Sequence, residues 1–171
     1  MRYYDLYESP HGRILLVASD EGLSGVYFDG QKHHPQLQTG WRRDARHALL
    51  RQATRELAEY FGGERKRFEI ALAPEGTSFQ CAVWKAISTV DFGTTITYGE
   101  LACRAGCPGS ARAAGAATGR NPIGIIVPCH RIVGSNGSLT GYAGGLEKKR
   151  ALLALEGAHA ESPTADLLAT A

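Results

Sequence analysis

The chain has 171 residues, of which 43% are hydrophobic and 21% charged, and a formal net charge of +2. This length and apolar content allow a buried core in one domain or two small ones, and they argue against large-scale disorder. No stretch approaches the roughly 18 apolar residues of a membrane span, and the N-terminal stretch MRYYDLYESP lacks the apolar core of a secretory signal. We therefore expect a cytoplasmic protein with no membrane partner and with reduced cysteines.

The first 75 residues predict a small domain made of antiparallel sheet and one helix. Three short strands separated by turns are expected, at residues 3–8, 13–19 and 23–30. Residues 31–44 show no period and are expected to form a loop. Helical spacing begins near Arg46 and stops at Gly62 and Gly63, and RKRFEIALA at 65–73 is a further strand candidate.

From Thr77 onward the pattern predicts a mainly helical domain. Two capping-box patterns, TSFQ and TYGE, mark helix starts. The second of these helices ends at Gly106, the turn CPGS follows, and Ser110 can cap a third helix, ARAAGAATG. Helix, tight turn and helix together are the outline of a helix-turn-helix. A short buried strand, IGIIV at 123–127, then precedes a final helix, LEKKRALLALE, that Gly157 stops.

These elements indicate an α/β protein of the α+β type with two domains. We place the sheet-plus-helix domain at 1–75, the helical domain at 76–159 and a loosely held tail at 160–171. Residues 1–75 carry 11 basic and 11 acidic side chains, whereas residues 76–157 carry 8 basic and 4 acidic ones. The positive surplus of the second domain is a mild sign of nucleic-acid binding, although a solvated basic face has the same composition.

A cysteine and a histidine stand side by side in the stretch IIVPCHRIVG. Cys129 follows Pro128 and precedes His130 and Arg131, which are neighbours that favour a thiolate over a thiol. Adjacent side chains of an extended strand point to opposite faces, so adjacency alone is weak evidence of a shared site. A buried, inert cysteine is the alternative interpretation.

The remaining cysteines are expected to be structural: Cys81, Cys103 and Cys107. The spacing of the last two, one helix turn apart, is compatible with zinc. No second Cys/His pair follows at metal-binding spacing, so we expect no metal site.

Glu156 is the more informative residue. It lies in the last turn of the final helix, where a carboxylate opposes the helix dipole at a cost of roughly 0.3 to 1 kcal/mol. It shares a face with Leu152 and Leu153, so we expect it to point inward. His130 is its natural partner, because a carboxylate can orient an imidazole that activates a thiol. A surface glutamate bonded to solvent or to Lys149 remains the alternative.

The helix ARAAGAATG contains almost only alanine and glycine, with Arg112 as its one long side chain. Small residues let a helix approach a DNA groove, and a lone arginine can fill the space that a flipped base leaves. A tightly packed core helix is the alternative. Tyr98 can be a core residue or a proton donor. Asn121, before Pro122, is typical of a turn. The glycines around Tyr142 indicate a loop that approaches a ligand.

In these motifs the sequence resembles the O6-alkylguanine-DNA alkyltransferases, which repair alkylated guanine by moving the alkyl group onto their own cysteine. The resemblance covers residues 77–157, about half the chain, and rests on TSFQCAVWKAI, TYGELA, ARAAGAATGRNPIGIIVPCHRIVGSNGSLTGYAGGL and KRALLALEG. It implies a ribonuclease-H-like N-terminal domain and a C-terminal domain with a winged helix-turn-helix. It implies no cofactor, because the reaction is a direct displacement that ends, after one turnover, in a stable thioether.

The resemblance also implies a role for each matching residue. Cys129 would accept the alkyl group, His130 would act as its base through a bound water, and Glu156 would orient His130. Tyr98 would donate a proton toward the guanine ring. Asn121 would brace the turn that leads to the active-site strand.

The same comparison assigns the surfaces that bind DNA and base. Arg112 would replace the flipped nucleotide, and the surface around it would be formed by Thr97, Ala111 and Ala113. The base pocket would be lined by Pro128, Arg131, Tyr142, Ala143 and Gly144. Because Ala143 has no hydroxyl, any hydrogen bond from this position to the guanine oxygen comes from its N–H group.

The expected partner is double-stranded DNA bearing O6-alkylguanine, bound by a protein that is a monomer in solution and can line up in several copies on DNA. Some family members carry an N-terminal zinc site, which we do not expect here because no cysteine precedes Cys81. Two other functions stay open. One is a cysteine hydrolase that uses Cys129, His130 and Glu156, in which Arg112 would have no role. The other is a helix-turn-helix protein that binds alkylated bases without repairing them, against which the presence of Cys129 argues.

Overall fold

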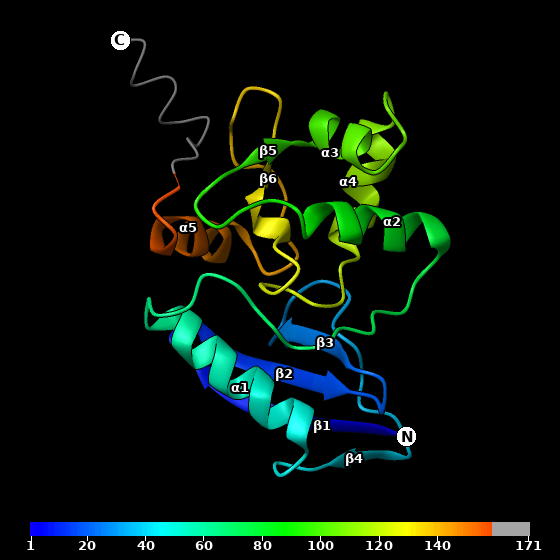
Figure 1. The fold of residues 1–171 in the computed structure, drawn as a ribbon, viewed down its shortest axis with the longest axis vertical. Helices are drawn as coiled ribbons and strands as arrows, with labels where there is room; N and C mark the ends of the chain where they lie inside the picture. Colours follow the sequence, from blue (N-terminus) through cyan, green and yellow to red (C-terminus); the bar gives the residue numbers. More distant parts are fainter. Residues whose placement is uncertain (159–171) are drawn as a thin grey trace. The chain divides into compact units, whose positions relative to one another are not determined.

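The computed structural model describes residues 1–158, so the tail expected from residue 160 lies outside the described residues. The described chain divides into two compact units (Figure 1). The first comprises residues 1–75 and 122–126, and the second comprises residues 76–121 and those from 127 onward. The sheet comes first and most helices second, which confirms the predicted α+β class. Within residues 1–158 no helix is both long and apolar enough to cross a membrane.

The first unit is built on a four-stranded sheet of order β3-β2-β1-β4. The predicted antiparallel meander is confirmed as β1 (Arg2–Ser9), β2 (Gly12–Ala18) and β3 (Leu23–Phe28). Gly12 begins β2 with a φ of +114°, a conformation that glycine adopts without strain. Pairing of Ser9 with Gly12 therefore closes a tight hairpin between β1 and β2.

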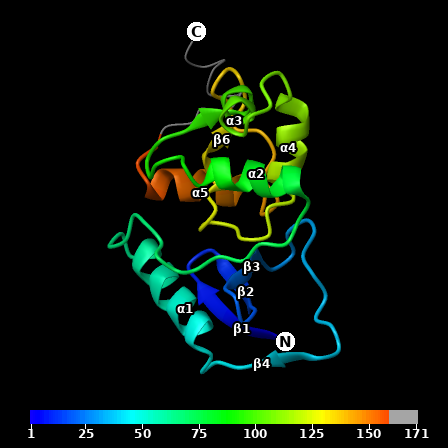
Figure 2. The same ribbon diagram turned by 45° about the vertical axis from the view of Figure 1, so that its right-hand side comes forward.

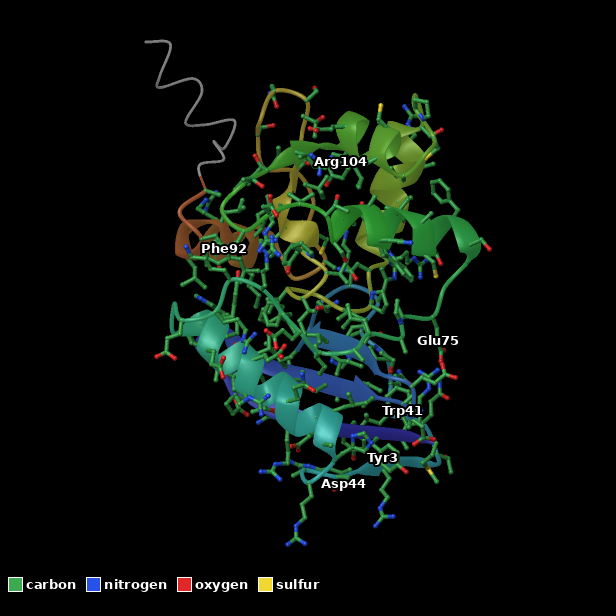
Figure 3. The ribbon with its side chains drawn as sticks, in the orientation of Figure 1. Tyr3, Trp41, Asp44, Glu75, Phe92 and Arg104 are labelled. Atoms are coloured by element: carbon green, nitrogen blue, oxygen red, sulfur yellow. The ribbon has the colours of Figure 1, made fainter. Side chains whose placement is uncertain are left out.

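A fourth strand, β4 (Trp41–Arg43), lies where we expected a loop, and that expectation is wrong. It pairs parallel with β1, and Figure 3 shows Trp41 and Tyr3 in this part of the sheet. The Arg2 guanidinium lies 5.5 Å from the centroid of the Trp41 ring. Three residues are too few to show the alternation that marks a strand, so only pairing in the fold defines this one.

Helix α1 (Ala48–Phe61) lies across one face of the sheet in both views (Figures 1 and 2). It ends where the glycine pair predicted, because Gly63 takes a φ of +78°. The N–H groups of Gly63 and Glu64 donate to the carbonyl oxygens of Tyr60 and Glu59, which is a Schellman motif. The stripe predicted to face the sheet is buried: Leu50, Ala53, Leu57 and Tyr60.

The segment 65–73, expected as a strand, forms only one isolated bridge between Leu72 and Leu23. A buried carboxylate takes over the role of a strand partner. The Glu56 side chain, 1% exposed, accepts the N–H groups of Glu69 at 3.1 Å and Ile70 at 3.3 Å, and its other oxygen accepts from Gln52. These bonds tie the segment to α1 through a side chain, which a search for strand periodicity does not detect.

Replacing Glu56 by alanine is expected to lower the unfolding free energy by about 2 to 4 kcal/mol, because two backbone N–H groups lose their acceptor. Equilibrium urea unfolding at neutral pH measures this loss. Glu64→Ala is the matched control, since Glu64 is exposed, and should change stability by no more than about 0.5 kcal/mol. Equal losses in the two variants would contradict a structural role for the Glu56 carboxylate.

The second unit contains the predicted helices: α2 (Ser78–Ile87), α3 (Tyr98–Arg104), α4 (Ala111–Gly119) and α5 (Leu146–Leu155). The capping box at the start of α2 is confirmed, because Thr77 and Gln80 exchange hydrogen bonds of 3.0 and 3.1 Å. At α3 only half of the expected box forms. Thr97 accepts from the Glu100 N–H at 3.2 Å, whereas the Glu100 carboxylate pairs with Arg104.

The helix-turn-helix outline is present as α3, the turn at 105–110 and α4, which pack on each other and on α2. Gly106 has a φ of +82° and ends α3 in a Schellman motif, as the sequence predicted. Ser110 precedes α4 but its side chain makes no capping bond, so the expected cap is wrong. The Trp84 ring N–H instead donates to the Ala117 carbonyl oxygen at 2.8 Å and fixes α4 against α2.

The apolar run at 123–127 is buried but forms no strand, which corrects that prediction. It makes one isolated bridge, between Ile123 and Val26, and Ile125 has a positive φ of +70°. An apolar run predicts burial and not conformation, which here is irregular. The active-site strand is instead the short β6 (Ile132–Val133), paired parallel with β5 (Ile96–Thr97).

Candidate active site

Cys129, His130 and Arg131 form a single turn of 3-10 helix, η1 (Cys129–Arg131), directly before β6. All three side chains are buried. Successive side chains of a 3-10 turn are about a third of a turn apart, and not on opposite faces as in a strand. In this turn, the side chains of Cys129 and His130 need not point to opposite faces, so the two residues can belong to one site.

The His130 ring is held by Glu156, and the expected contact is present. The His130 Nε2 atom lies 2.7 Å from Glu156 Oε2, and both side chains are fully buried. Glu156 follows the last residue of α5, and Gly157, at a φ of +73°, ends the helix. The N–H of Gly93 also donates to Glu156 Oε1 at 3.3 Å. These buried hydrogen bonds offset the unfavourable interaction of the carboxylate with the helix dipole.

Arg131 completes this network. Its Nε donates to Glu156 Oε1 at 2.8 Å and its Nη2 to Glu156 Oε2 at 3.0 Å, while Nη1 donates to the Val90 carbonyl oxygen at 2.7 Å. The guanidinium also lies 5.7 Å from the ring centroid of Phe92, which Figure 3 labels. Every nitrogen of the guanidinium is thus engaged inside the protein. This placement is that of a structural clamp on Glu156, while the pocket position that the resemblance implied for Arg131 stays a prediction.

The geometry assigns the proton on His130. Because Glu156 accepts from Nε2, we assign the hydrogen to Nε2, which leaves a lone pair on Nδ1. Nδ1 is buried and makes no hydrogen bond to any group of residues 1–158. Burial lowers the pKa of His130 below its ordinary value, against the opposing effect of Glu156. The ring is therefore neutral at pH 7 and can accept a proton at Nδ1.

Cys129 is 7% exposed and is the only buried cysteine of the described chain. Burial raises the pKa of its thiol above the ordinary value, although a hydrogen bond from Asn121 and the charge of Lys149 act in the opposite direction. The sequence predicted that His130 and Arg131 would favour the thiolate, and this prediction is wrong. The histidine is neutral and the charge of the arginine is paired with Glu156, so neither offsets the cost of burial. The resting group is a thiol that needs a base.

Asn121 and Tyr98 both lie at this cysteine. The Asn121 amide donates to the Val127 carbonyl oxygen at 2.8 Å and also bonds the Cys129 side chain, so it connects the end of α4 to the active-site turn. Tyr98 begins α3, packs its ring near Gly115 of α4 and bonds its hydroxyl to the Thr140 side chain. Burial raises the pKa of the Tyr98 phenol, which keeps it protonated at neutral pH.

The proposed DNA-binding residues lie on the helix-turn-helix. Ala114 and Ala117 are buried inside the unit, whereas Arg112 and Ala113 are exposed on the opposite side of α4 and Ala111 is half-buried. Arg112 makes no hydrogen bond or ion pair within the described residues, so its side chain is available to a partner. The last member of the set, Thr97, uses its hydroxyl to cap α3.

The proposed pocket loop follows β6. Tyr142, Ala143 and Gly144 are half-buried, and the loop ends at Gly145, which precedes α5 with a φ of +96°. Pro128 is buried directly before the active-site turn. No group of three or more His, Cys, Asp or Glu side chains within residues 1–158 is arranged to hold a metal ion.

Sequence reasoning missed one buried residue of this region. Lys149 of α5 is fully buried, and its ammonium donates to three carbonyl oxygens. A signal was present in the sequence, because Lys149 stands three and four residues before Leu152 and Leu153 and so shares the apolar face of the helix. Thr140, which bonds Tyr98, gave no comparable signal.

Comparison with known proteins agrees with this geometry. Residues 2–74 match the family model of the 6-O-methylguanine DNA methyltransferase ribonuclease-like domain, and residues 78–158 match that of its DNA-binding domain. A methylated-DNA–protein-cysteine methyltransferase of Methanosarcina acetivorans is 50% identical over 155 residues, which are 91% of this chain and 98% of that protein. One from Mycolicibacterium paratuberculosis is 44% identical over 91% of this chain and 93% of its own length.

Solved structures with a similar fold support the same family. The fold is similar to that of Mycobacterium tuberculosis OGT in complex with DNA, with a TM-score of 0.84, 43% identity and coverage of 91% and 92% of the two chains. It is similar to the crystal structure of M. tuberculosis O6-methylguanine methyltransferase, with a TM-score of 0.83, 42% identity and coverage of 98% and 99%. Both domains and their order thus coincide with one family. The chain belongs to the 6-O-methylguanine DNA methyltransferase family.

Proposed function

We propose that Cys129 accepts the alkyl group of an O6-alkylguanine, chiefly O6-methylguanine, in one irreversible transfer. As a member of its family the protein is a DNA-repair methyltransferase that acts on methylated DNA. The observation that carries the proposal is the buried Cys129 thiol in a turn whose next residue, His130, is neutral and fixed by Glu156. No other cysteine of the described chain combines burial with such a neighbour.

The reaction is a direct displacement at the alkyl carbon. Nδ1 of His130 takes the thiol proton through a bound water, as the resemblance implies, and the resulting thiolate attacks. The bond between carbon and the guanine oxygen breaks as the carbon–sulfur bond forms. Tyr98 gives a proton toward the guanine ring, so that neutral guanine leaves, and a thioether remains on Cys129.

Duplex DNA is the proposed partner, with the helix-turn-helix as the contact surface. The small side chains of α4 allow close approach to a groove, and the exposed Arg112 is placed to fill the gap left by the flipped base. The basic surplus of residues 76–157 favours binding to phosphates. We propose that the protein acts in the cytoplasm as a monomer, and that several copies can bind side by side on DNA.

Intact-protein mass spectrometry after reaction with a duplex that contains one O6-methylguanine tests this function. We expect each protein molecule to gain one methyl group, on Cys129, and then to be inactive. Several turnovers per protein molecule would indicate a cysteine hydrolase or another true catalyst. Binding without any mass gain would indicate a protein that recognises the damaged base but does not repair it.

Replacing Arg112 by alanine is expected to slow repair of duplex DNA far more than reaction with free O6-benzylguanine, because only the duplex requires base flipping. Losing a finger of this kind should cost about a few kcal/mol of unstacking energy in the duplex assay, which means a loss of tenfold or more. Arg104→Ala is a suitable control, since Arg104 lies on α3 and is paired with Glu100. Equal losses of Arg112→Ala in both assays would rule out the finger role.

A further inference from the structure

Lys149 is a buried cation that the proposed reaction does not yet use. Its side chain is 0% exposed, and its ammonium donates to the carbonyl oxygens of Ile132 at 2.6 Å, Thr140 at 2.7 Å and Gly141 at 3.3 Å. Ile132 directly follows the active-site turn, and Gly141 begins the proposed pocket loop. One side chain of α5 thus joins the turn that carries Cys129 to the loop that would hold the base.

Lys149 has no negative partner at rest. It forms no ion pair with a carboxylate within residues 1–158. The Glu156 carboxylate at the end of the same helix is occupied by Arg131 and His130. Carbonyl dipoles satisfy the three N–H bonds of an ammonium but do not neutralise its charge, and an unpaired buried charge is costly. A group that becomes negative close to the Lys149 ammonium would offset this cost.

The charged and titratable groups around Lys149 identify that group. Helix α5 packs on the active-site turn, and the Lys149 charge acts on both Cys129 and His130. Burial is the main cause that lowers the pKa of His130 and keeps the ring able to accept a proton, and the charges of Arg131 and Lys149 act in the same direction. The Cys129 thiol becomes negative first, when His130 takes its proton. Tyr98, which also faces Cys129, is still protonated at that stage, because burial raises its pKa, and it gives up its proton only as guanine leaves.

We propose that the Lys149 ammonium is a positioning residue with two tasks: it is the buried counter-charge of the Cys129 thiolate, and it anchors the pocket loop to the active-site turn. The inference rests on the proposed role of Cys129 as acceptor. The thiolate is formed in a site that excludes water, where a fixed positive charge is more effective than in solvent. The same charge has no partner once the sulfur has become a neutral thioether.

The wild-type protein already offers a test. Burial lowers the pKa of Lys149 to about 8, so the ammonium is charged at neutral pH and loses its proton above that value. Below the Lys149 midpoint, the rate of Cys129 modification by iodoacetamide should rise about tenfold per pH unit, as the thiolate fraction does. Above the midpoint the curve should flatten, because each further thiolate must form beside an uncharged amine. His130 remains neutral over this range, since its pKa is lowered.

The experiment uses a background in which Cys81, Cys103 and Cys107 are replaced by serine, so that Cys129 is the only thiol. The Lys149 midpoint is measured independently by NMR of its Nζ group in the same protein. A rate that continues to rise tenfold per pH unit straight through that midpoint would overturn the counter-charge. Iodoacetamide needs no DNA, so this result is independent of whether methyl transfer occurs.

Substitution of Lys149 provides a second test. K149M should slow Cys129 modification at pH 7 about tenfold, which corresponds to one unit in the thiol pKa, and K149R should restore most of the loss. K85M is the control, because Lys85 is an exposed lysine of the same unit. A folded K149M protein with an unchanged pH profile would refute the counter-charge, and should K149M not fold, the wild-type curve decides the question.

Discussion

Replacing Cys129 by alanine is expected to abolish methyl transfer completely while leaving duplex binding within about twofold of wild type. The sulfur forms the new bond, and no other described cysteine lies at the His130–Glu156 pair. Cys129 is 7% exposed and small, so removal of its sulfur costs about 1 kcal/mol of packing, too little to unfold the chain. Intact-protein mass spectrometry and a gel-shift titration on the same preparation measure the two properties.

Cys103→Ala is the control for this experiment. Cys103 lies on α3 of the same unit but is exposed, so both transfer and binding should be retained. Residual transfer by Cys129→Ala would show that another cysteine is the acceptor. Loss of both transfer and DNA binding would mean that Cys129 has a structural role.

Replacing Glu156 by glutamine is expected to lower the unfolding free energy by about 3 to 5 kcal/mol, because it leaves the buried Arg131 charge without its partner. Glutamine has a single acceptor oxygen, whereas the carboxylate accepts from Arg131 twice, from His130 and from Gly93. Methyl transfer at a temperature where the variant remains folded should fall by about 100-fold, since the base is no longer held.

An exposed ion pair provides the comparison for Glu156. Glu100→Gln breaks the pair with Arg104 on the surface of α3 and should change stability by no more than about 1 kcal/mol. Urea unfolding of both variants, together with single-turnover kinetics, separates the two effects. Loss of stability with an unchanged transfer rate would show that Glu156 clamps Arg131 but does not orient His130.

The Glu156–His130 contact illustrates what could be predicted. The position of Glu156 on the apolar face of α5 predicted that it points inward, and a buried carboxylate near an imidazole has few other partners. Arg131 shows the limit of this reasoning. No sequence signal indicated that Arg131 clamps Glu156, and its carbonyl partner Val90 is 41 residues away in the chain. The resemblance located the region of the site, while the fold decided which side chains face it.

The charge state of Cys129 also could not be predicted from its neighbours in the sequence. A cysteine next to a histidine and an arginine reads as a thiolate, since the sequence shows which charges are near but not which are paired. In the fold, Glu156 pairs with the arginine and holds the imidazole, while burial raises the pKa of the thiol. Among residues 1–158, Lys149, 20 positions away in the sequence, is the cation that acts on the sulfur without a carboxylate partner.

By itself the sequence determined the family, the α+β class, the helices with their glycine stops, and Cys129 as the reactive candidate, because these depend on local motifs and on periodicity. The tertiary structure alone decided that β4 is a strand, that residues 123–127 are irregular, that Arg131 clamps Glu156 and that Lys149 lies at the active-site turn. The physical reason is that pairing and burial are properties of residues distant in the chain. Local sequence does not specify the distant partners that pair a short strand, stabilise a buried charge or shift a pKa.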